Sequence, residues 1–358
     1  MYRFMRAMVA FVLVLMIGPG LISAQEEETA QIPENIREAL LAGGVNLQFG
    51  FYDADNYDPH QFDDELPLIA AAGAKHVRLP ISMDVLERDQ TGRLRSDRFV
   101  DLKNFVELAQ SNGLVTIIDV HNTGMRECEG CPWTENYMWG VTDSAVRTRH
   151  TRLLLALTTE LYRSGLERDW FVIQPANEPI FSANPGDWYD YQAELLGEMR
   201  LECPDCVIFA MANDWQSIIA TVSNFNPPFD DPLLIYDVHF YEPLGLTHCA
   251  YPGQANQCGG LEFPGTYETW RGEELWDRAR IEALFQPLVD WRDQYGVTVH
   301  FSEVGTADGL AEDVRAAYLG DVTSIMRDNG FGYTIYEWHR NFGIKNFPEV
   351  IAAVFPGN

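Results

Sequence analysis

Eight short runs of apolar and β-branched residues alternate along the chain with longer segments whose apolar residues recur at helical spacing. Strands that are apolar throughout are buried on both faces, which is typical of a parallel sheet covered by helices. Eight such units favour a closed barrel over an open doubly wound sheet, and no glycine-rich phosphate loop follows the first run. We therefore predict an α/β fold, a single-domain (β/α)8 TIM barrel. The predicted strands are 44–49, 76–80, 115–120, 170–175, 207–211, 234–240, 297–302 and 332–337.

The N-terminal segment 1–24 has the pattern of a secretory signal peptide. Arg3 and Arg6 precede a short apolar stretch, and small residues follow it at a suitable cleavage site. A transmembrane anchor is the alternative, but the apolar stretch is short for a bilayer and acidic residues follow it at once. We expect a secreted protein, extracellular or periplasmic, with a polar tail at 25–36 and a catalytic domain at 37–358.

The chain is strongly acidic. It has 53 Asp and Glu residues against 25 Lys and Arg residues, a formal net charge of −28. Such a protein is repelled by phosphate backbones and by anionic membrane surfaces. We expect no nucleic-acid partner, no membrane association after signal cleavage, and a partner that is neutral or cationic. We also expect a monomer.

The six cysteines fall into three close pairs: Cys128 with Cys131, Cys203 with Cys206, and Cys249 with Cys258. In an exported protein, three local disulfides are the simplest interpretation. A structural zinc site built from such pairs is the alternative.

Two of the predicted connections, 121–142 and 241–272, are longer than a minimal barrel needs. Both leave the carboxyl ends of strands, where barrel enzymes have their active sites. Each contains a cysteine pair and several aromatic residues. These loops are predicted either to form the walls of a cleft or simply to pack their aromatic side chains against the barrel.

Two carboxylates end the fourth and seventh predicted strands. Glu178 follows Asn177 after the fourth, where Pro175 predicts an irregular strand end, and Glu303 follows Ser302 in the seventh. The two would face each other across the barrel mouth. Hydrolysis of a glycosidic bond needs such a pair, one carboxylic acid to protonate the leaving oxygen and one carboxylate at the anomeric carbon.

From about residue 43 to residue 338 the sequence resembles glycoside hydrolase family 5, which belongs to a superfamily of barrel glycosidases with catalytic acids on strands four and seven. The resemblance implies that Glu178 is the acid/base and Glu303 the nucleophile of a retaining enzyme. The segments that carry it are Gly44-Val45-Asn46-Leu47, His76-Val77-Arg78-Leu79-Pro80, Asp119-Val120-His121-Asn122, Asn177-Glu178-Pro179, Asp237-Val238-His239-Phe240-Tyr241, Ser302-Glu303-Val304-Gly305 and Trp338.

The resemblance also implies roles for residues around the two acids. Arg78 would hold the nucleophile, Asn177 would bind the sugar 2-hydroxyl, and Trp338 would stack on a sugar, with a cis peptide between Trp338 and His339. His121, His239 and Tyr241 would complete the pocket. Asp119 and Asp237, two residues before the histidines, are candidates to support them.

Several of these residues have a plainer interpretation. Arg78 alone could form a structural ion pair, and His121 and His239 could be core histidines. Trp215, after the fifth strand, is either a sugar platform or a packing residue. His76, His150 and His300 are predicted to be structural.

The leading hypothesis is a retaining endo-β-1,4-glycanase, a cellulase-like β-glucan hydrolase acting on a neutral β-linked polysaccharide or oligosaccharide. The alternatives are a β-mannanase or another β-glycosidase of the family and, as a non-enzymatic case, a sugar-binding barrel without catalysis. The sequence contains no metal-ligand set or cofactor motif, and this chemistry needs none.

Overall fold

The protein was analysed as a computed structural model that describes residues 30–48, 50–52, 54–121, 144–180, 185–250, 258–269 and 272–357. The expected signal peptide and nearly all of the 121–142 loop lie outside the described residues. Within them, no helix is both long and apolar enough to cross a membrane.

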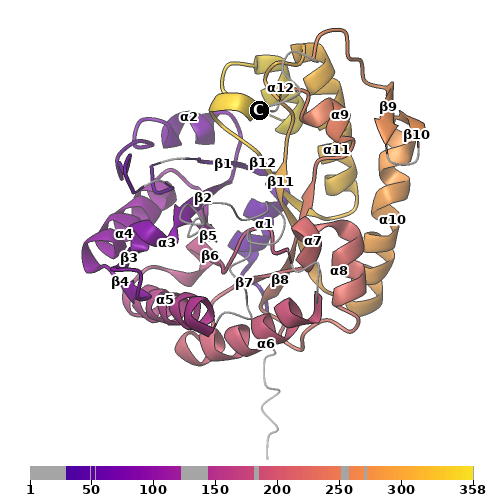
Figure 1. Cartoon of the computed structure of the whole chain (residues 1–358). Helices are drawn as coiled ribbons and strands as arrows, with labels where there is room; N and C mark the ends of the chain where they lie inside the picture. The colour runs from indigo at the N-terminus through magenta and orange to yellow at the C-terminus, as the bar shows by residue number, and fades with distance from the viewer. Residues whose placement is uncertain are drawn as a thin grey trace, which may run out of the picture.

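Eight parallel strands close into a barrel, as the sequence predicts (Figure 1). Around the barrel they follow the order β1, β2, β5, β6, β7, β8, β11 and β12, and β12 pairs with β1 to close it. Every residue of β2, β5 and β8 is buried, as expected for strands covered on both sides. The strands are β1 Gly44–Asn46, β2 His76–Ser82, β5 Val115–His121, β6 Phe171–Gln174, β7 Ile208–Met211, β8 Leu234–Phe240, β11 Thr298–Val304 and β12 Gly332–Ile335.

Helices surround the barrel (Figure 1). In α4 the buried residues Phe99, Leu102, Val106 and Ala109 form the stripe that the sequence predicts. The helices are α1 Glu34–Ala42, α2 Leu66–Ala71, α3 Met83–Leu86, α4 Ser96–Ser111, α5 Ser144–Arg163, α6 Pro185–Glu202, α7 Asn213–Gln216, α8 Ile218–Asn224, α9 Leu244–Thr247, α10 Arg278–Tyr295, α11 Glu312–Asp328 and α12 Pro348–Val354, with 3-10 turns at Arg168–Trp170 and Arg340–Phe342.

Two small hairpins are additions to the barrel plan. One pairs β3 Glu87–Arg88 with β4 Arg93–Leu94, and the other pairs β9 Gly265–Thr269 with β10 Gly272–Trp276. The second belongs to the long connection after β8. Figure 1 shows it on the outside of the barrel, next to α10.

Helix α1 covers the amino ends of the strands. The polar tail expected at 25–36 ends earlier, because Glu34 begins α1 and Ile36 is fully buried. The sequence carries the signal for this start, since Pro33 precedes the helix and Ile36, Ala39 and Leu40 are spaced to share one helical face.

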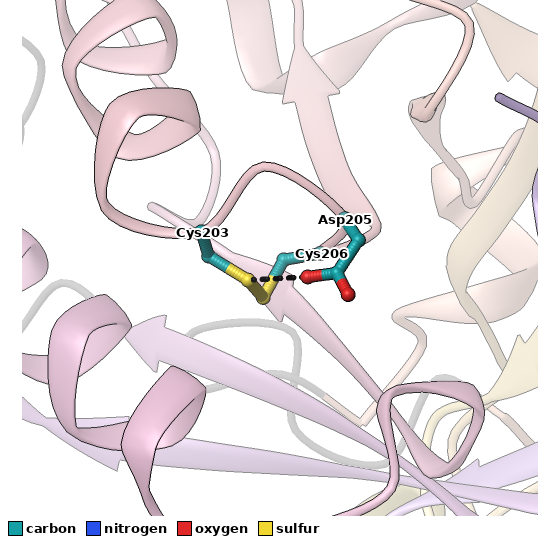
Figure 2. Close-up of side chains that lie close together, drawn as sticks. All are labelled: Cys203, Asp205 and Cys206. Atoms are coloured by element: carbon teal, nitrogen blue, oxygen red, sulfur yellow. Dashed lines mark hydrogen bonds between the residues drawn. A yellow bond between two sulfur atoms is a disulfide. The ribbon is translucent and has the colours of Figure 1, made fainter.

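Two of the expected disulfides lie within the described residues, and both are formed. The Cα atoms are 5.5 Å apart in Cys203–Cys206 and 5.0 Å apart in Cys249–Cys258. The first joins the end of α6 to the start of β7, with Oδ1 of Asp205 3.4 Å from a sulfur (Figure 2). Because these sulfurs are bonded to each other, neither pair offers thiolates to zinc.

The third expected disulfide, between Cys128 and Cys131, is not among the bonds that the structure describes. Cys128 and Cys131 both belong to the loop after β5, and both lie outside the described residues. The bridge between Cys128 and Cys131 therefore stays a prediction, in contrast to the two that are formed.

The fourth barrel strand ends at Gln174, one residue before Pro175, so the irregular end predicted from the proline is confirmed. The carbonyl of Pro175 contacts Nε2 of His150 at 2.9 Å, and Nδ1 of the same ring contacts the Tyr191 hydroxyl at 2.6 Å. His150 on α5 therefore holds the segment that leads to Glu178. This is the structural role expected for it.

Candidate active site

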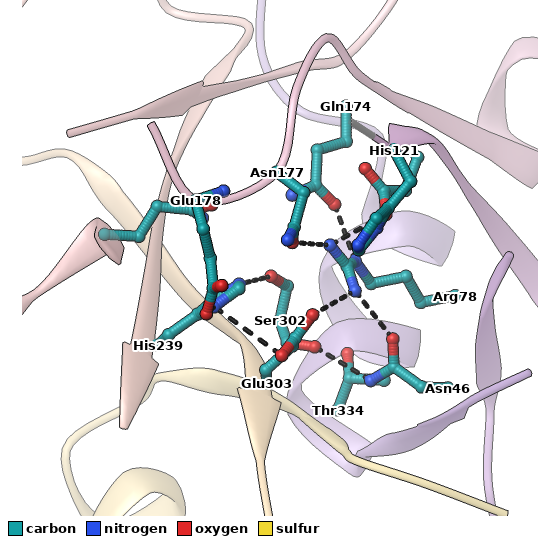
Figure 3. Close-up of polar contacts among 12 residues, drawn as sticks. Asn46, Arg78, His121, Gln174, Asn177, Glu178, His239, Ser302, Glu303 and Thr334 are labelled. Carbon is teal, nitrogen blue, oxygen red and sulfur yellow. Dashed lines mark hydrogen bonds and ion pairs between the residues drawn. The ribbon is translucent and has the colours of Figure 1, made fainter. Parts of the chain in front are cut away.

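Glu303 reaches the barrel mouth because β11 is irregular just before it. Along β11 and β8, Phe301 pairs with Val238 and Glu303 pairs with His239, so Ser302 is an extra residue. Such a bulge re-aims the side chains that follow it. Here Ser302 and Glu303 both point into the same cluster (Figure 3).

Arg78 lies at the centre of this cluster and is fully buried (Figure 3). A guanidinium has five N–H donors in a fixed plane. Nη1 donates to Glu303 and Asn46 at 2.7 and 2.8 Å, Nη2 contacts Asn177 and Asp119 at 2.7 and 2.9 Å, and Nε donates to Gln174 at 2.7 Å. Five donors therefore meet five acceptors, and the orientation of Arg78 is fixed from every side.

The surroundings of Glu303 keep it ionised. Its Oε1 accepts from Arg78, and its Oε2 accepts a 2.8 Å hydrogen bond from the hydroxyl of Tyr241. Burial alone would raise the pKa of Glu303, but His239, Arg78 and His121, with the bond from Tyr241, outweigh burial and lower it. A buried carboxylate that stays charged is suited to act as a nucleophile.

Glu178 follows β6 in a left-handed conformation, with φ of 46°. Its amide donates to Oε1 of Gln216 at 2.6 Å, which fixes this unusual backbone. The side chain is 16% exposed, and its Oε1 lies 2.8 Å from Nδ1 of His239. One oxygen of Glu178, one of Glu303 and one ring nitrogen of His239 all lie within 4.8 Å of one another.

His239 lies between the two acids and is supported from behind. Its Nε2 lies 2.9 Å from Oγ of Ser302, and that hydroxyl donates to Asp237 at 2.7 Å. The hydroxyl of Ser302 therefore donates its proton to Asp237, and its oxygen accepts a hydrogen bond from Nε2 of His239. Nδ1 of His239 is left to face Glu178. Burial would lower the pKa of His239, but Glu303, Glu178 and Asp237 outweigh it and raise the pKa, so the ring favours its charged form.

Most of the other predicted site residues join this cluster. His121 contacts Asp119 at 2.5 Å, and Asn177 accepts from Arg78. Asp119 and Asp237 support the site as expected, although Asp237 acts on His239 through Ser302. Trp215 is separate from the cluster and 38% exposed, and its amide donates to the carbonyl of Pro179, next to Glu178.

Trp338 does not reach the two acids. It is 3% exposed, and its indole nitrogen donates to Glu65 at 3.0 Å, on the side of α2. Tyr336 instead lies beside Tyr241, with ring centroids 6.4 Å apart. The cis peptide expected after Trp338 is also misplaced, since the non-proline cis bond joins Tyr336 to Glu337. Because β12 ends at Ile335, the alternation of the strand does not extend to Trp338.

Sequence reasoning assigned no role to four polar residues of the network, namely Asn46, Gln174, Gln216 and Ser302, although Asn46 and Ser302 lie in the segments that carry the resemblance. Gln174 accepts from Arg78 and donates to Asp237 at 2.9 Å, while Gln216 also donates to Asp237 at 2.7 Å. A usable signal was present for Gln174 and Ser302, since each is a polar residue at the end of an otherwise apolar strand. A buried amide or hydroxyl in that place needs partners.

Comparison with known proteins agrees with this geometry. Residues 44–342 match the family model described as cellulase, glycosyl hydrolase family 5. The chain belongs to glycosyl hydrolase family 5. As a member of family 5 it is a glycoside hydrolase, which sets aside the alternative of a sugar-binding barrel without catalysis.

Two relatives and one solved structure that match over most of their length are distant in sequence. Cellodextrinase A of Ruminococcus flavefaciens is 25% identical over 280 residues, which cover 78% of this chain and 79% of that protein. Endoglucanase C of Acetivibrio thermocellus is 21% identical, covering 87% and 94%. The crystal structure of endoglucanase Cel5A from Thermotoga maritima superposes with a TM-score of 0.72 at 17% identity, covering 89% and 99%. This last likeness concerns the fold.

Proposed function

We propose that this family 5 hydrolase is a retaining endo-β-1,4-glucanase in which Glu303 is the nucleophile and Glu178 the acid/base. The proposal rests above all on the two carboxylates, since one oxygen of Glu178 and one oxygen of Glu303 lie no more than 4.8 Å apart at the mouth of the barrel. Retaining enzymes hold their carboxyl groups about 5–5.5 Å apart, whereas inverting enzymes need about 6.5–9.5 Å to admit a water molecule.

The different surroundings of the two acids support the assignment of roles. Glu303 is buried against the positive charge of Arg78 and accepts a hydrogen bond from Tyr241, which favours the ionised form. Glu178 is more exposed, and its ionic contact within the described residues is with His239 rather than with an arginine or lysine. A carboxyl group in that position can carry a proton to the leaving oxygen and take one from water afterwards.

The reaction would then proceed in two steps. Glu303 attacks the anomeric carbon while the glycosidic C–O bond breaks, and Glu178 gives its proton to the departing oxygen. The product is a glycosyl ester on Glu303. Water then attacks the same carbon and loses a proton to Glu178, which releases the sugar and frees Glu303.

The role of the acids is tested by exchanging each of them. Glu178→Ala should retain hydrolysis of aryl glycosides with good leaving groups far better than hydrolysis of polysaccharide, because only the latter needs a proton donor. Glu303→Ala should abolish both. Proton NMR of fresh product decides the stereochemistry, and an initial α-anomer from a β-linked substrate would reject a retaining mechanism.

The glucan preference is inferred from the family and from relatives named cellodextrinase and endoglucanase. β-Mannan is the alternative, since Cel5A of Thermotoga maritima has also been crystallised with mannotriose. Reducing-sugar release from mixed-linkage glucan, carboxymethylcellulose, mannan, xyloglucan and laminarin separates the candidates. A rapid fall in viscosity at low release of reducing ends would confirm endo action.

A further inference from the structure

We propose that the Cys249–Cys258 disulfide holds the hydrogen bond between Tyr241 and Glu303 in place, with His248 as the positioning residue that connects the two. The inference rests on the proposed role of Glu303. It assigns a function to a cross-linked segment that lies outside the acid cluster itself.

The first step of the argument is the contact between His248 and Tyr241. The two rings meet edge to face, with centroids 4.9 Å apart and an angle of 74° between their planes. Phe342 packs against both rings, at 5.1 Å from His248 and 6.0 Å from Tyr241. The ring whose hydroxyl contacts Glu303 is therefore held from the side by His248.

The second step is the hydrogen bonding around Thr247, the last residue of α9. Its hydroxyl donates to the carbonyl of Tyr241 at 2.5 Å and lies 2.9 Å from Nδ1 of His248. Because the Thr247 hydroxyl donates its proton to the carbonyl of Tyr241, the same hydroxyl oxygen accepts a hydrogen bond from Nδ1–H of a neutral His248 ring. Burial lowers the pKa of His248 to about 4, so this neutral form persists at working pH.

The third step is the disulfide itself. Cys249 follows His248 directly, and its partner Cys258 packs against the loop after β11, the strand that carries Glu303. A Cβ on Gly309 in that loop would lie only 3.2 Å from Sγ of Cys258. The amide of Ala307 also donates to the carbonyl of Thr247 at 2.8 Å. Thr247 and Cys258 therefore contact the loop that follows Glu303, while His248 contacts Tyr241, so the described residues on both sides of the disulfide touch both elements.

Loss of the cross-link should weaken this bond and so raise the pKa of Glu303. The groups that lower this pKa are Arg78 on β2, His121 on β5, and His239 and Tyr241 from β8. The other titratable groups that face it are Glu178 after β6, His248 after α9, and Tyr336 and Glu337 after β12. Among these, the disulfide reaches His248 directly and Tyr241 through the ring contact with His248.

The test compares the two disulfides that the structure describes. C249S/C258S should lower kcat on 4-nitrophenyl β-cellobioside about tenfold and move the acid limb of kcat/KM upward by about half a pH unit or more. C203S/C206S removes the cross-link at the opposite, amino end of the barrel. It should lower Tm without moving the acid limb.

Two further variants separate positioning from general stability. H248A, with the disulfide intact, should shift the acid limb in the same direction, and H248F should restore it because the ring contact returns. In a Y241F background, C249S/C258S should cause no further shift. If C249S/C258S does not fold, H248A and H248F carry the test alone.

The proposal is overturned if folded C249S/C258S or H248A keeps the wild-type acid limb, or if the shift persists undiminished in Y241F. Failure of the proposed function looks different. In that case the wild type itself would release no product, or Glu303→Ala would remain active.

Discussion

At the scale of single residues, the site depends on one guanidinium whose hydrogen bonds are all used. Arg78 connects Glu303 with residues of β1, β5 and the end of β6. An ammonium group has three donors and no planar fork, so lysine retains the charge but not the geometry.

We therefore expect Arg78→Lys to lower kcat by about 100-fold, because Glu303 and Asn177 would no longer be held together. The acid limb should move upward, since a more distant positive charge lowers the pKa of Glu303 less. Stability should fall by about 3 kcal/mol. Arg37→Lys, at an exposed position of α1, is the matched control, and a pH–rate profile with urea unfolding measures both effects. An unchanged kcat would show that Arg78 is only structural.

Trp215 is held in an unusual backbone conformation. Asp214, Trp215 and Gln216 have φ values of 61°, 58° and 56°, a left-handed run that costs roughly 1–2 kcal/mol per residue. The hydrogen bonds from the Trp215 amide to Pro179 and from the Glu178 amide to Gln216 fasten this run to the acid.

We expect Trp215 to contact the sugar that leaves from the Glu178 side. Trp215→Ala should therefore reduce kcat/KM on polysaccharide about tenfold, a loss of roughly 1.4 kcal/mol, and affect aryl glycosides with small leaving groups little. Tyr162→Ala, which removes an equally exposed aromatic ring near the end of α5, should affect neither substrate. Equal losses on both substrates would rule out a leaving-group platform.

Not all of the site could be predicted at this scale. Motifs identify Arg78, Glu178, Tyr241 and Glu303 because each lies in or shortly after a barrel strand that the sequence predicts. Trp338 was misplaced because the strand before it was predicted to run to residue 337, whereas β12 ends at Ile335. His248 escaped notice because its contacts depend on how two loops pack.

At the scale of secondary-structure elements, a chain of hydrogen bonds connects α1 to the barrel strands. Nδ1 of His76 lies 2.9 Å from the carbonyl of Ala39, and both His76 and His300 place Nε2 2.8 Å from the hydroxyl of Thr334. Burial lowers the pKa of His76 to about 4 and that of His300 well below its usual value. Below pH 6.5 these histidines therefore bind protons in the unfolded chain but remain neutral in the folded chain. The free energy of unfolding should consequently fall as the pH is lowered through this range.

Thr334→Val should break this chain of hydrogen bonds without changing the shape of the side chain. We expect a loss of about 2 kcal/mol, since buried groups on both histidines lose their partner. Urea unfolding at pH 7 measures the loss, and the pH–rate profile should remain that of the wild type because the Thr334 hydroxyl contacts His76 and His300 rather than Glu178 or Glu303. Thr159→Val on α5 is a control at a partly buried helix position. Full stability of Thr334→Val would show that this chain of hydrogen bonds contributes nothing.

The elements themselves were the most predictable level. Strand β8 was placed to the residue at both ends, and the other barrel strands differ from prediction by one to three residues at an end. Apolar runs define buried parallel strands well because such strands have no polar face. The hairpin β9–β10 was not foreseen, because its alternately buried and exposed residues lie outside the barrel pattern.

At the scale of the whole molecule, the net charge of −28 should affect the rate at which charged substrates associate with the protein. Repulsion between like charges is long-range at low ionic strength and is screened over about 10 Å at 0.1 M salt. A neutral polysaccharide is indifferent to this field, whereas an anionic derivative is not.

Salt should therefore change the apparent preference among glucans. We expect the ratio of kcat/KM on carboxymethylcellulose to that on mixed-linkage glucan to rise about threefold or more between 10 and 300 mM NaCl. The rate on the neutral substrate should stay nearly constant and serves as the internal control. A ratio that is independent of salt would show that the surface charge lies too far from the cleft to matter.

Gln174 has a consequence for how this enzyme can change over time. Its carbonyl oxygen accepts from Arg78 beside Glu303, and its amide nitrogen donates to Asp237, which supports the histidine beside Glu178. One side chain thus joins the supports of both acids, so substitutions on the two sides will not combine independently. Variants that alter the surroundings of both acids would therefore need substitutions on both sides of Gln174 at the same time. Libraries that randomise the residues around only one of the two acids would miss such combinations.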